Sequence, residues 1–155
     1  MLEEEIGGRL AAQRLTLAVA ESCTGGLLGH RITSASGSSA YFVGGVIAYA
    51  NDVKVRELGV PADALAKDGA VSEPVARHMA EGVRERLRAD IGIGITGVAG
   101  PEGGTESKPV GLVFVAVAGP KGAVAGRFQF GGDRAAVKTA ASEAALEMLT
   151  QYLQQ

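Results

Sequence analysis

The sequence Leu15-Thr-Leu-Ala-Val-Ala20 runs directly into Ala20-Glu-Ser-Cys-Thr-Gly-Gly-Leu27, and this junction indicates the class of fold. The first stretch is a short apolar run typical of a buried β-strand. After it, Leu27-Leu-Gly-His-Arg-Ile32 has the pattern of an amphipathic helix. A turn with hydroxyl groups and paired glycines therefore lies between a strand and a helix N-terminus. Because free backbone N–H groups and the positive end of the helix dipole meet there, we expect the turn to suit an anion or a developing oxyanion.

Strand and helix patterns alternate through the rest of the chain. The apolar periodicity predicts further strands over 41–50, 89–95, 110–118 and 123–130, and helices over 2–13, 51–58, 61–66, 72–87 and 134–153. The last two strands are joined only by Gly119-Pro-Lys-Gly122, a link so short that it requires an antiparallel hairpin. We expect an α/β fold: a single three-layer α/β/α domain over 1–155, with a mixed, mostly parallel sheet and one antiparallel hairpin.

Composition excludes several classes of protein. The chain has 155 residues, 46% of them apolar and only 5% aromatic, which suits one domain with an aliphatic core. The net charge is −2 without a basic block, so we expect no nucleic-acid partner. Apolar runs are too short to span a membrane, and the acidic N-terminus is unlike a secretory signal. The single cysteine excludes an internal disulfide and fits a reducing cytoplasm. Because this cysteine and the two histidines are scattered along the chain, we expect no metal site, and we expect no cofactor.

The turn after the first strand holds two candidate nucleophiles, Ser22 and Cys23. Ser22 or Thr24 could simply cap the helix, and Cys23 could be an ordinary buried residue. A nucleophilic serine needs a base, and neither histidine has a suitable context. Lys54 remains, one turn beyond an apolar strand, and it could act as a base if burial lowered its pKa. The Tyr49 phenol could hydrogen-bond between a hydroxyl and this ammonium, although Lys54 could also be a solvated helix lysine.

A glycine-rich loop, Thr96-Gly-Val-Ala-Gly-Pro-Glu-Gly-Gly-Thr105, is the second candidate feature. Glycine lets backbone N–H groups approach a phosphate or carboxylate closely, although the loop lacks the ending of a P-loop and could merely be mobile. Arg134 lies at a helix start, where a cation is electrostatically unfavourable. Its position suggests a nearby ligand anion, or an ion pair with Asp133.

Several motifs occur together in a fixed order: Ala20-Glu-Ser-Cys-Thr-Gly-Gly26, Tyr49 through Lys54, Gly69-Ala-Val-Ser-Glu-Pro74, Gly97-Val-Ala-Gly-Pro101, Lys108-Pro-Val-Gly111 and Gly131-Gly-Asp-Arg134. This set resembles the C-terminal domain family of the competence-damage-inducible protein CinA, including its stand-alone PncC form. The resemblance covers nearly the whole chain. Because CinA proteins carry a further N-terminal domain, the chain looks like either the stand-alone form or an excised domain.

The resemblance implies a Ser/Lys amidohydrolase that converts nicotinamide mononucleotide to nicotinate mononucleotide and ammonia in pyridine nucleotide salvage. By motif, Ser22 is the implied nucleophile, Lys54 the base and Tyr49 their hydrogen-bonding companion. The expected substrate-binding residues are Glu21, Thr24, Gly25, Gly26, Thr96, Gly97, Gly100, Thr105 and Arg134, with Glu21 open to a structural role. The partner expected is this nucleotide, and we also expect a homo-oligomer. A non-catalytic nucleotide-binding or protein-interaction module, or hydrolysis of another amide, remains the alternative.

Overall fold

The computed structural model describes residues 1–155 and contains the predicted elements with small shifts at their ends. In chain order they are α1 (Leu2–Gln13), β1 (Leu17–Glu21), α2 (Leu27–Thr33), a short 3₁₀ helix η1 (Ser38–Ala40), β2 (Phe42–Ile47), α3 (Asn51–Leu58), α4 (Ala62–Asp68), α5 (Glu73–Arg86), β3 (Ile91–Gly97), β4 (Leu112–Gly119), β5 (Gly122–Gln129) and α6 (Arg134–Gln154). Only η1 was not expected from the sequence.

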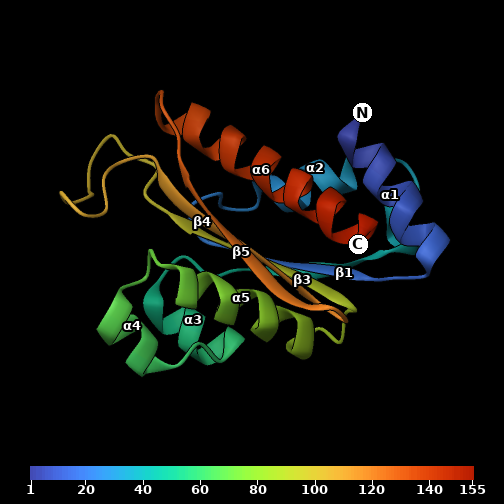
Figure 1. Cartoon of the computed structure of the whole chain (residues 1–155), viewed down its shortest axis with the longest axis horizontal. Helices are drawn as coiled ribbons and strands as arrows, with labels where there is room; N and C mark the ends of the chain where they lie inside the picture. The colour runs from blue at the N-terminus through green and yellow to red at the C-terminus, as the bar shows by residue number, and fades with distance from the viewer.

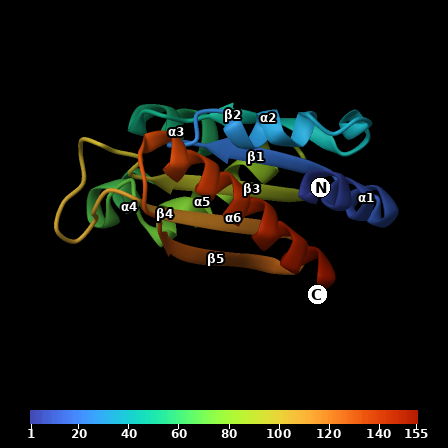
Figure 2. The same ribbon diagram turned by 90° about the horizontal axis from the view of Figure 1, so that it is seen from above.

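The five strands form one mixed sheet in the order β2-β1-β3-β4-β5, which Figure 2 shows from above. β1 pairs in parallel with both β2 and β3, whereas β4 and β5 form the predicted antiparallel hairpin. The α/β fold class is therefore confirmed. β3 and β4 also pair in antiparallel fashion, a pairing the sequence analysis did not specify. The glycine loop between them reverses the chain without a crossover helix, so β4 returns in the opposite direction.

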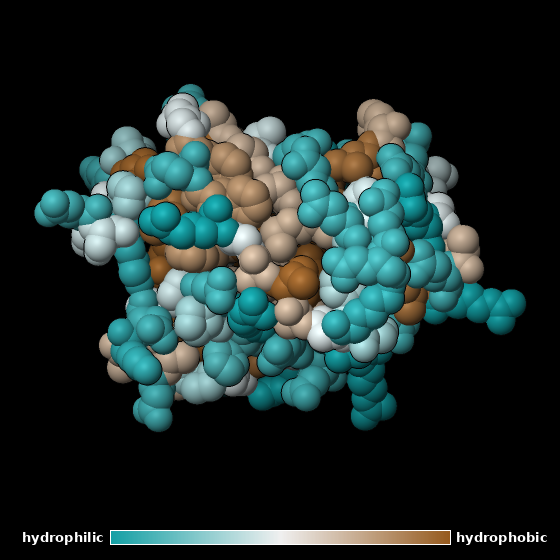
Figure 3. Space-filling model, viewed as in Figure 1, coloured by the Kyte–Doolittle hydropathy of each residue, from teal (hydrophilic) through white to brown (hydrophobic).

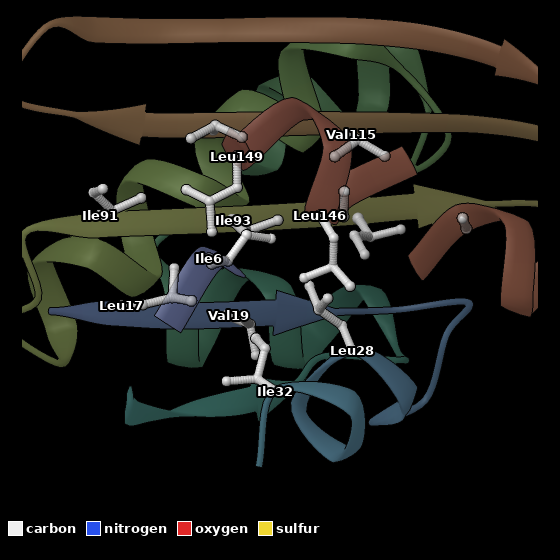
Figure 4. Close-up of a cluster of buried hydrophobic side chains, with 14 of the residues drawn as sticks. Ile6, Leu17, Val19, Leu28, Ile32, Ile91, Ile93, Val115, Leu146 and Leu149 are labelled. Carbon is white, nitrogen blue, oxygen red and sulfur yellow. The ribbon is translucent and has the colours of Figure 1, made fainter. Parts of the chain in front are cut away.

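Helices cover both faces of the sheet (Figure 1). α1, α2 and α6 lie on one face, and α3, α4 and α5 lie on the other. The larger core lies under α6, where alternate β-branched residues of β3 and β4 meet Leu146 and Leu149 (Figure 4). Because side chains alternate along a strand, the residues between them face α5 instead.

α5 packs unusually close to the sheet because β3 reads Ile91-Gly-Ile-Gly-Ile95. The isoleucines point toward α6, and Gly92 and Gly94 present bare backbone to α5. A Cβ on Gly94 would lie 2.5 Å from the carbonyl oxygen of Ala76 and 2.7 Å from the nitrogen of Ala80. The glycines therefore set the distance between this helix and the sheet.

The outer strand β5 leaves an apolar groove against α6. Figure 3 shows apolar residues gathered in this region of an otherwise largely hydrophilic face. The groove has a volume of about 320 Å³, and Val124, Phe128, Met148 and Tyr152 contribute to its lining. Homo-oligomer formation stays a prediction. None of the helices combines the length and the apolar character needed to cross a bilayer.

We predict that Gly94→Ala lowers the free energy of unfolding by about 1–3 kcal/mol, because the added methyl group overpacks the contact with α5. Chemical denaturation with urea measures this change. Gly8→Ala is the matched control, since a Cβ there meets no atom within 4 Å. In that exposed helical position alanine should be neutral or stabilising. Equal stability of the two variants would contradict the close contact between α5 and the sheet.

Candidate functional site

The candidate site lies at the carboxyl ends of the three parallel strands. Ser22 follows β1, Tyr49 lies beyond β2, and Thr96 lies near the end of β3. Strand register aligns these ends, because Glu21 pairs with Ile47 on one side and with Ile95 on the other. Such an edge is where open α/β sheets usually bind ligands. Parallel pairing thus brings together residues that are distant in the sequence.

Lys54 and Ser22 are in direct contact. Nζ of Lys54 lies 3.1 Å from Oγ of Ser22 and donates a second hydrogen bond, at 3.0 Å, to the backbone carbonyl of Tyr49. The lysine side chain is fully buried, with 1% of its surface exposed, and it has no carboxylate partner. Burial lowers the pKa of Lys54 below its ordinary value, because a desolvated ammonium is disfavoured. The site therefore holds a serine hydroxyl beside an amine that loses its proton more easily than a surface lysine.

The expected position of the Tyr49 phenol is wrong. The phenol does not lie between Ser22 and Lys54, because the side chain points outward and is 61% exposed. Its hydroxyl instead lies 3.0 Å from a guanidinium nitrogen of Arg134. Only the backbone carbonyl of Tyr49 contacts the lysine. The residue thus orients the amine through its main chain, while its side chain contacts a different part of the site.

Glu21 caps the helix that follows the Ser22 turn. Its buried carboxylate accepts hydrogen bonds from the backbone N–H groups of Gly26, Leu28 and Gly29, at 2.9–3.2 Å. The Gly25 N–H donates to the carbonyl of Ser22. The N–H groups of Gly26, Leu28 and Gly29 are therefore not available to a ligand anion, because an internal carboxylate already occupies them. Glu21 has the structural role that the sequence analysis left open.

Two backbone donors next to Ser22 remain free. The N–H groups of Cys23 and Thr24 donate no hydrogen bond to another residue. The Thr24 hydroxyl is buried without a hydrogen-bond partner, and Thr24 is not among the residues that line the main pocket. Both N–H groups therefore lack a partner within the protein, and of the two residues Cys23 lines the pocket beside Ser22.

The pocket at this edge has a volume of about 260 Å³. Its lining includes Ser22, Cys23, Tyr49, Asn51, Lys54, Thr96, Gly97, Gly100, Glu102 and Arg134. The Thr96 hydroxyl donates to the carbonyl of Ala70, so it ties the wall of the pocket to the segment before α5. Thr105 does not reach the pocket; it lies on the exposed loop, where it bonds with Lys108. Gly25 and Gly26 also lie outside this pocket.

Cys23 is poorly suited to act as the nucleophile. Burial raises the pKa of its thiol to about 11, so little thiolate exists near neutral pH. Arg134 lies at the mouth of the pocket and donates to Gly100 O at 2.6 Å. It forms no ion pair with Asp133, whose carboxylate instead caps α6 at Ala136. Of the two alternatives for Arg134, the ion pair with Asp133 is therefore absent.

The sequence motifs match one protein family over nearly the whole chain. A sequence model of the CinA C-terminal domain matches residues 1–153. This chain belongs to the CinA C-terminal domain family. CinA-like proteins from Gemmatimonas aurantiaca and Chlorobium limicola are 60% and 53% identical over 90% and 99% of the chain, respectively. The chain spans only 32% and 37% of the length of these two relatives.

Solved structures of CinA proteins share this fold. A competence-damaged protein (CinA) superfamily protein from Klebsiella pneumoniae superposes with a TM-score of 0.95 at 35% identity, over 99% of this chain and 96% of that one. A competence/damage inducible protein from Agrobacterium tumefaciens gives a TM-score of 0.92 at 38% identity, over 100% and 97% of the two chains. The CinA domain fold therefore accounts for the entire chain.

We predict that Glu21→Ala lowers the free energy of unfolding by about 2 kcal/mol or more, because one buried and two partly buried N–H groups lose a charged acceptor. Glu21→Gln should lose less, since its amide oxygen can still accept. Glu147→Ala, at an exposed position of α6, is the control and should change stability by less than about 0.5 kcal/mol. Thermal and urea denaturation measure both changes. If Glu21→Ala lost no more stability than Glu147→Ala, the capping role of Glu21 would be contradicted.

Proposed function

We propose that the protein is an amidohydrolase that converts nicotinamide mononucleotide to nicotinate mononucleotide and ammonia, in cytoplasmic pyridine nucleotide salvage. The contact between buried Lys54 and Ser22 is the observation that supports it most directly. A hydroxyl beside an amine of lowered pKa is the pairing that serine–lysine acyl transfer requires. Membership of the CinA family is consistent with this activity.

The first step is attack of Ser22 on the carboxamide carbon. Neutral Lys54 uses its lone pair to take the proton of Ser22 Oγ, while one of its N–H groups keeps the hydrogen bond to the Tyr49 carbonyl. The carbonyl of Tyr49 thus holds the amine in the orientation that points its lone pair at the hydroxyl. The C–O bond forms as the amide C=O electrons move to oxygen.

The resulting oxyanion needs hydrogen-bond donors next to Ser22. The free N–H groups of Cys23 and Thr24 are the donors we propose, because those of Gly25 and Gly26 are already occupied. Each such donor can contribute about 3 kcal/mol to the transition state. Of the expected substrate-binding residues Thr24, Gly25 and Gly26, this proposal keeps only Thr24 as an oxyanion donor and adds Cys23.

The intermediate then collapses and the ester is hydrolysed. The ammonium of Lys54 returns its proton to the departing nitrogen, the C–N bond breaks, and ammonia leaves a nicotinoyl ester on Ser22. Lys54 next removes a proton from water, which attacks the ester carbon. The C–O bond to Ser22 then breaks as the Lys54 ammonium returns the proton to Oγ, which releases nicotinate mononucleotide and regenerates the free serine and the neutral amine. The net reaction consumes one water and forms one carboxylate and one ammonium ion, because the carboxylic acid gives its proton to ammonia near neutral pH.

Ammonia release tests the proposal. The purified protein is incubated with nicotinamide mononucleotide, with nicotinamide riboside and with nicotinamide, and ammonia is quantified. We expect the mononucleotide to be the preferred substrate. Binding of the mononucleotide without turnover would favour the non-catalytic module, and turnover of an unrelated amide alone would favour a different amidase.

Ser22→Ala should abolish ammonia release while the protein stays folded, because the alanine lacks the attacking oxygen. Cys23→Ala should keep most of the activity, since the thiol is protonated at neutral pH. Steady-state kinetics on both variants, with circular dichroism to verify folding, make the comparison. An inactive but folded Cys23→Ala variant would identify the thiol as the nucleophile instead.

Lys54→Arg should be nearly as inactive as Lys54→Ala, because a guanidinium keeps its proton in a protein and cannot serve as a base. In the wild type, kcat/KM should rise with pH as Lys54 loses its proton. The apparent pKa of this rise should lie below the value of about 10.4 for a free lysine. Substantial turnover by Lys54→Arg would mean that another group takes the serine proton.

A further inference from the structure

Arg134 has a positive charge without a negative partner. Its guanidinium donates to two neutral oxygens, the Gly100 carbonyl and the Tyr49 hydroxyl, and it forms no ion pair. The side chain lines the pocket that contains Ser22 and Lys54. A guanidinium held in this way can turn its remaining N–H groups toward an anion.

A second cavity adjoins the first at Arg134. It has a volume of about 520 Å³, and Arg134 and Ala99 line both cavities. Lys138 also lines it, one turn after Arg134 on α6 and therefore on the same face of that helix. The Lys138 ammonium forms neither an ion pair nor a hydrogen bond, although the residue is only partly exposed.

Lys138 also reaches back to the Ser22 turn. A Cβ built on Gly25 would lie 3.7 Å from its Nζ atom, so the ammonium lies close to the backbone of this turn. Asp133 is the one acid that lines the second cavity, and its carboxylate accepts a hydrogen bond from Ala136 at the start of α6. The second cavity is therefore lined by two cations and by one carboxylate that is already hydrogen-bonded, and it lies next to the pocket that contains Ser22 and Lys54.

We propose that Arg134 and Lys138 form an anion subsite that binds the phosphate of the substrate, and that the Tyr49 hydroxyl positions Arg134 for it. The identity of the phosphate as that of a mononucleotide rests on the proposed function. The carboxamide lies at Ser22 in the first cavity, and the phosphate lies in the second, on the far side of Arg134. Two cations bind a phosphate dianion by charge-assisted hydrogen bonds.

The subsite explains the exposed Tyr49 side chain. Its hydroxyl is 3.0 Å from Arg134 and has no contact with Lys54, so it is a positioning residue rather than a proton relay. It fixes the guanidinium from the β2 side of the pocket, while Gly100 fixes it from the glycine loop. Without the hydroxyl, the arginine loses one of the two contacts that orient it.

The ratio of kcat/KM for nicotinamide mononucleotide to kcat/KM for nicotinamide riboside tests the subsite. Lys138→Gln should lower this ratio about ten-fold or more, mainly through KM for the mononucleotide. Lys138→Arg, which keeps the charge, should restore most of it. Tyr49→Phe should lower the ratio by a smaller factor. Lys121→Gln, in the turn between β4 and β5 at the opposite end of these strands, removes the same charge and should leave the ratio unchanged.

An unchanged ratio in Lys138→Gln would overturn the role of Lys138, and an unchanged ratio in Tyr49→Phe would overturn the positioning role. A binding measurement separates the subsite from the reaction. By calorimetry, ribose 5-phosphate should bind the wild type more tightly than ribose does, and Lys138→Gln should weaken it about ten-fold. If this holds but no ammonia is released, the proposed function fails and the subsite stands. Equal binding of the two sugars overturns the subsite whether or not ammonia is released.

Discussion

Burial of the Lys54 amine beside Ser22 is the constraint on which the rest of this structure depends. An ammonium that is 99% shielded from water, with two neutral oxygens for partners and no carboxylate, is costly to keep charged. The protein thereby favours the neutral amine, and a neutral amine is what a general base must be. The same burial that reduces stability at this position supplies the chemistry we propose.

The lysine reaches this position through a series of close backbone contacts. Ser22 extends from β1, which pairs with β3, and the glycines of β3 let α5 approach the sheet. On its other side α5 carries Gly82, whose hydrogen atom faces the Leu58 carbonyl at the end of α3, where a Cβ would overlap. α3 carries Lys54. Packing distance between the sheet and two helices therefore determines the distance between the serine and the amine.

The order of elements could be predicted from the sequence because apolar periodicity is a local property. The contact between Ser22 and Lys54 depends on strand order. Exclusion of the histidines therefore made Lys54 a candidate base but left it open to a solvated position, and the family resemblance then favoured the pairing. Tyr49 was misplaced because its position in the chain does not determine which way its side chain points. Glu21 offered an unused signal, since an acid just before a helix N-terminus is a suitable cap. Lys138 lies four residues after Arg134, but only the cavity distinguishes it from a surface lysine.

Charge is distributed along the site in a way that suits a two-ended substrate. The reacting end has a buried amine without a counterion, and the other end has Arg134 and Lys138 without ion pairs. Glu21, the acid within the Ser22 turn, is directed into α2 and away from the pocket, whereas Glu102 of the glycine loop lines the pocket. Helix capping thus removes a negative charge from the site and leaves two backbone N–H groups next to the nucleophile.

The titration of the Lys54 side chain tests this account most directly. Selective isotopic labelling of the lysine side chains, with Lys54 assigned by its absence in the Lys54→Arg variant, allows its protonation to be followed by NMR as the pH changes. We predict a midpoint clearly below those of the surface lysines, because burial disfavours its charged form. A midpoint among those of the surface lysines, near the ordinary value of about 10.4, would contradict the claim that the fold prepares this amine as a base.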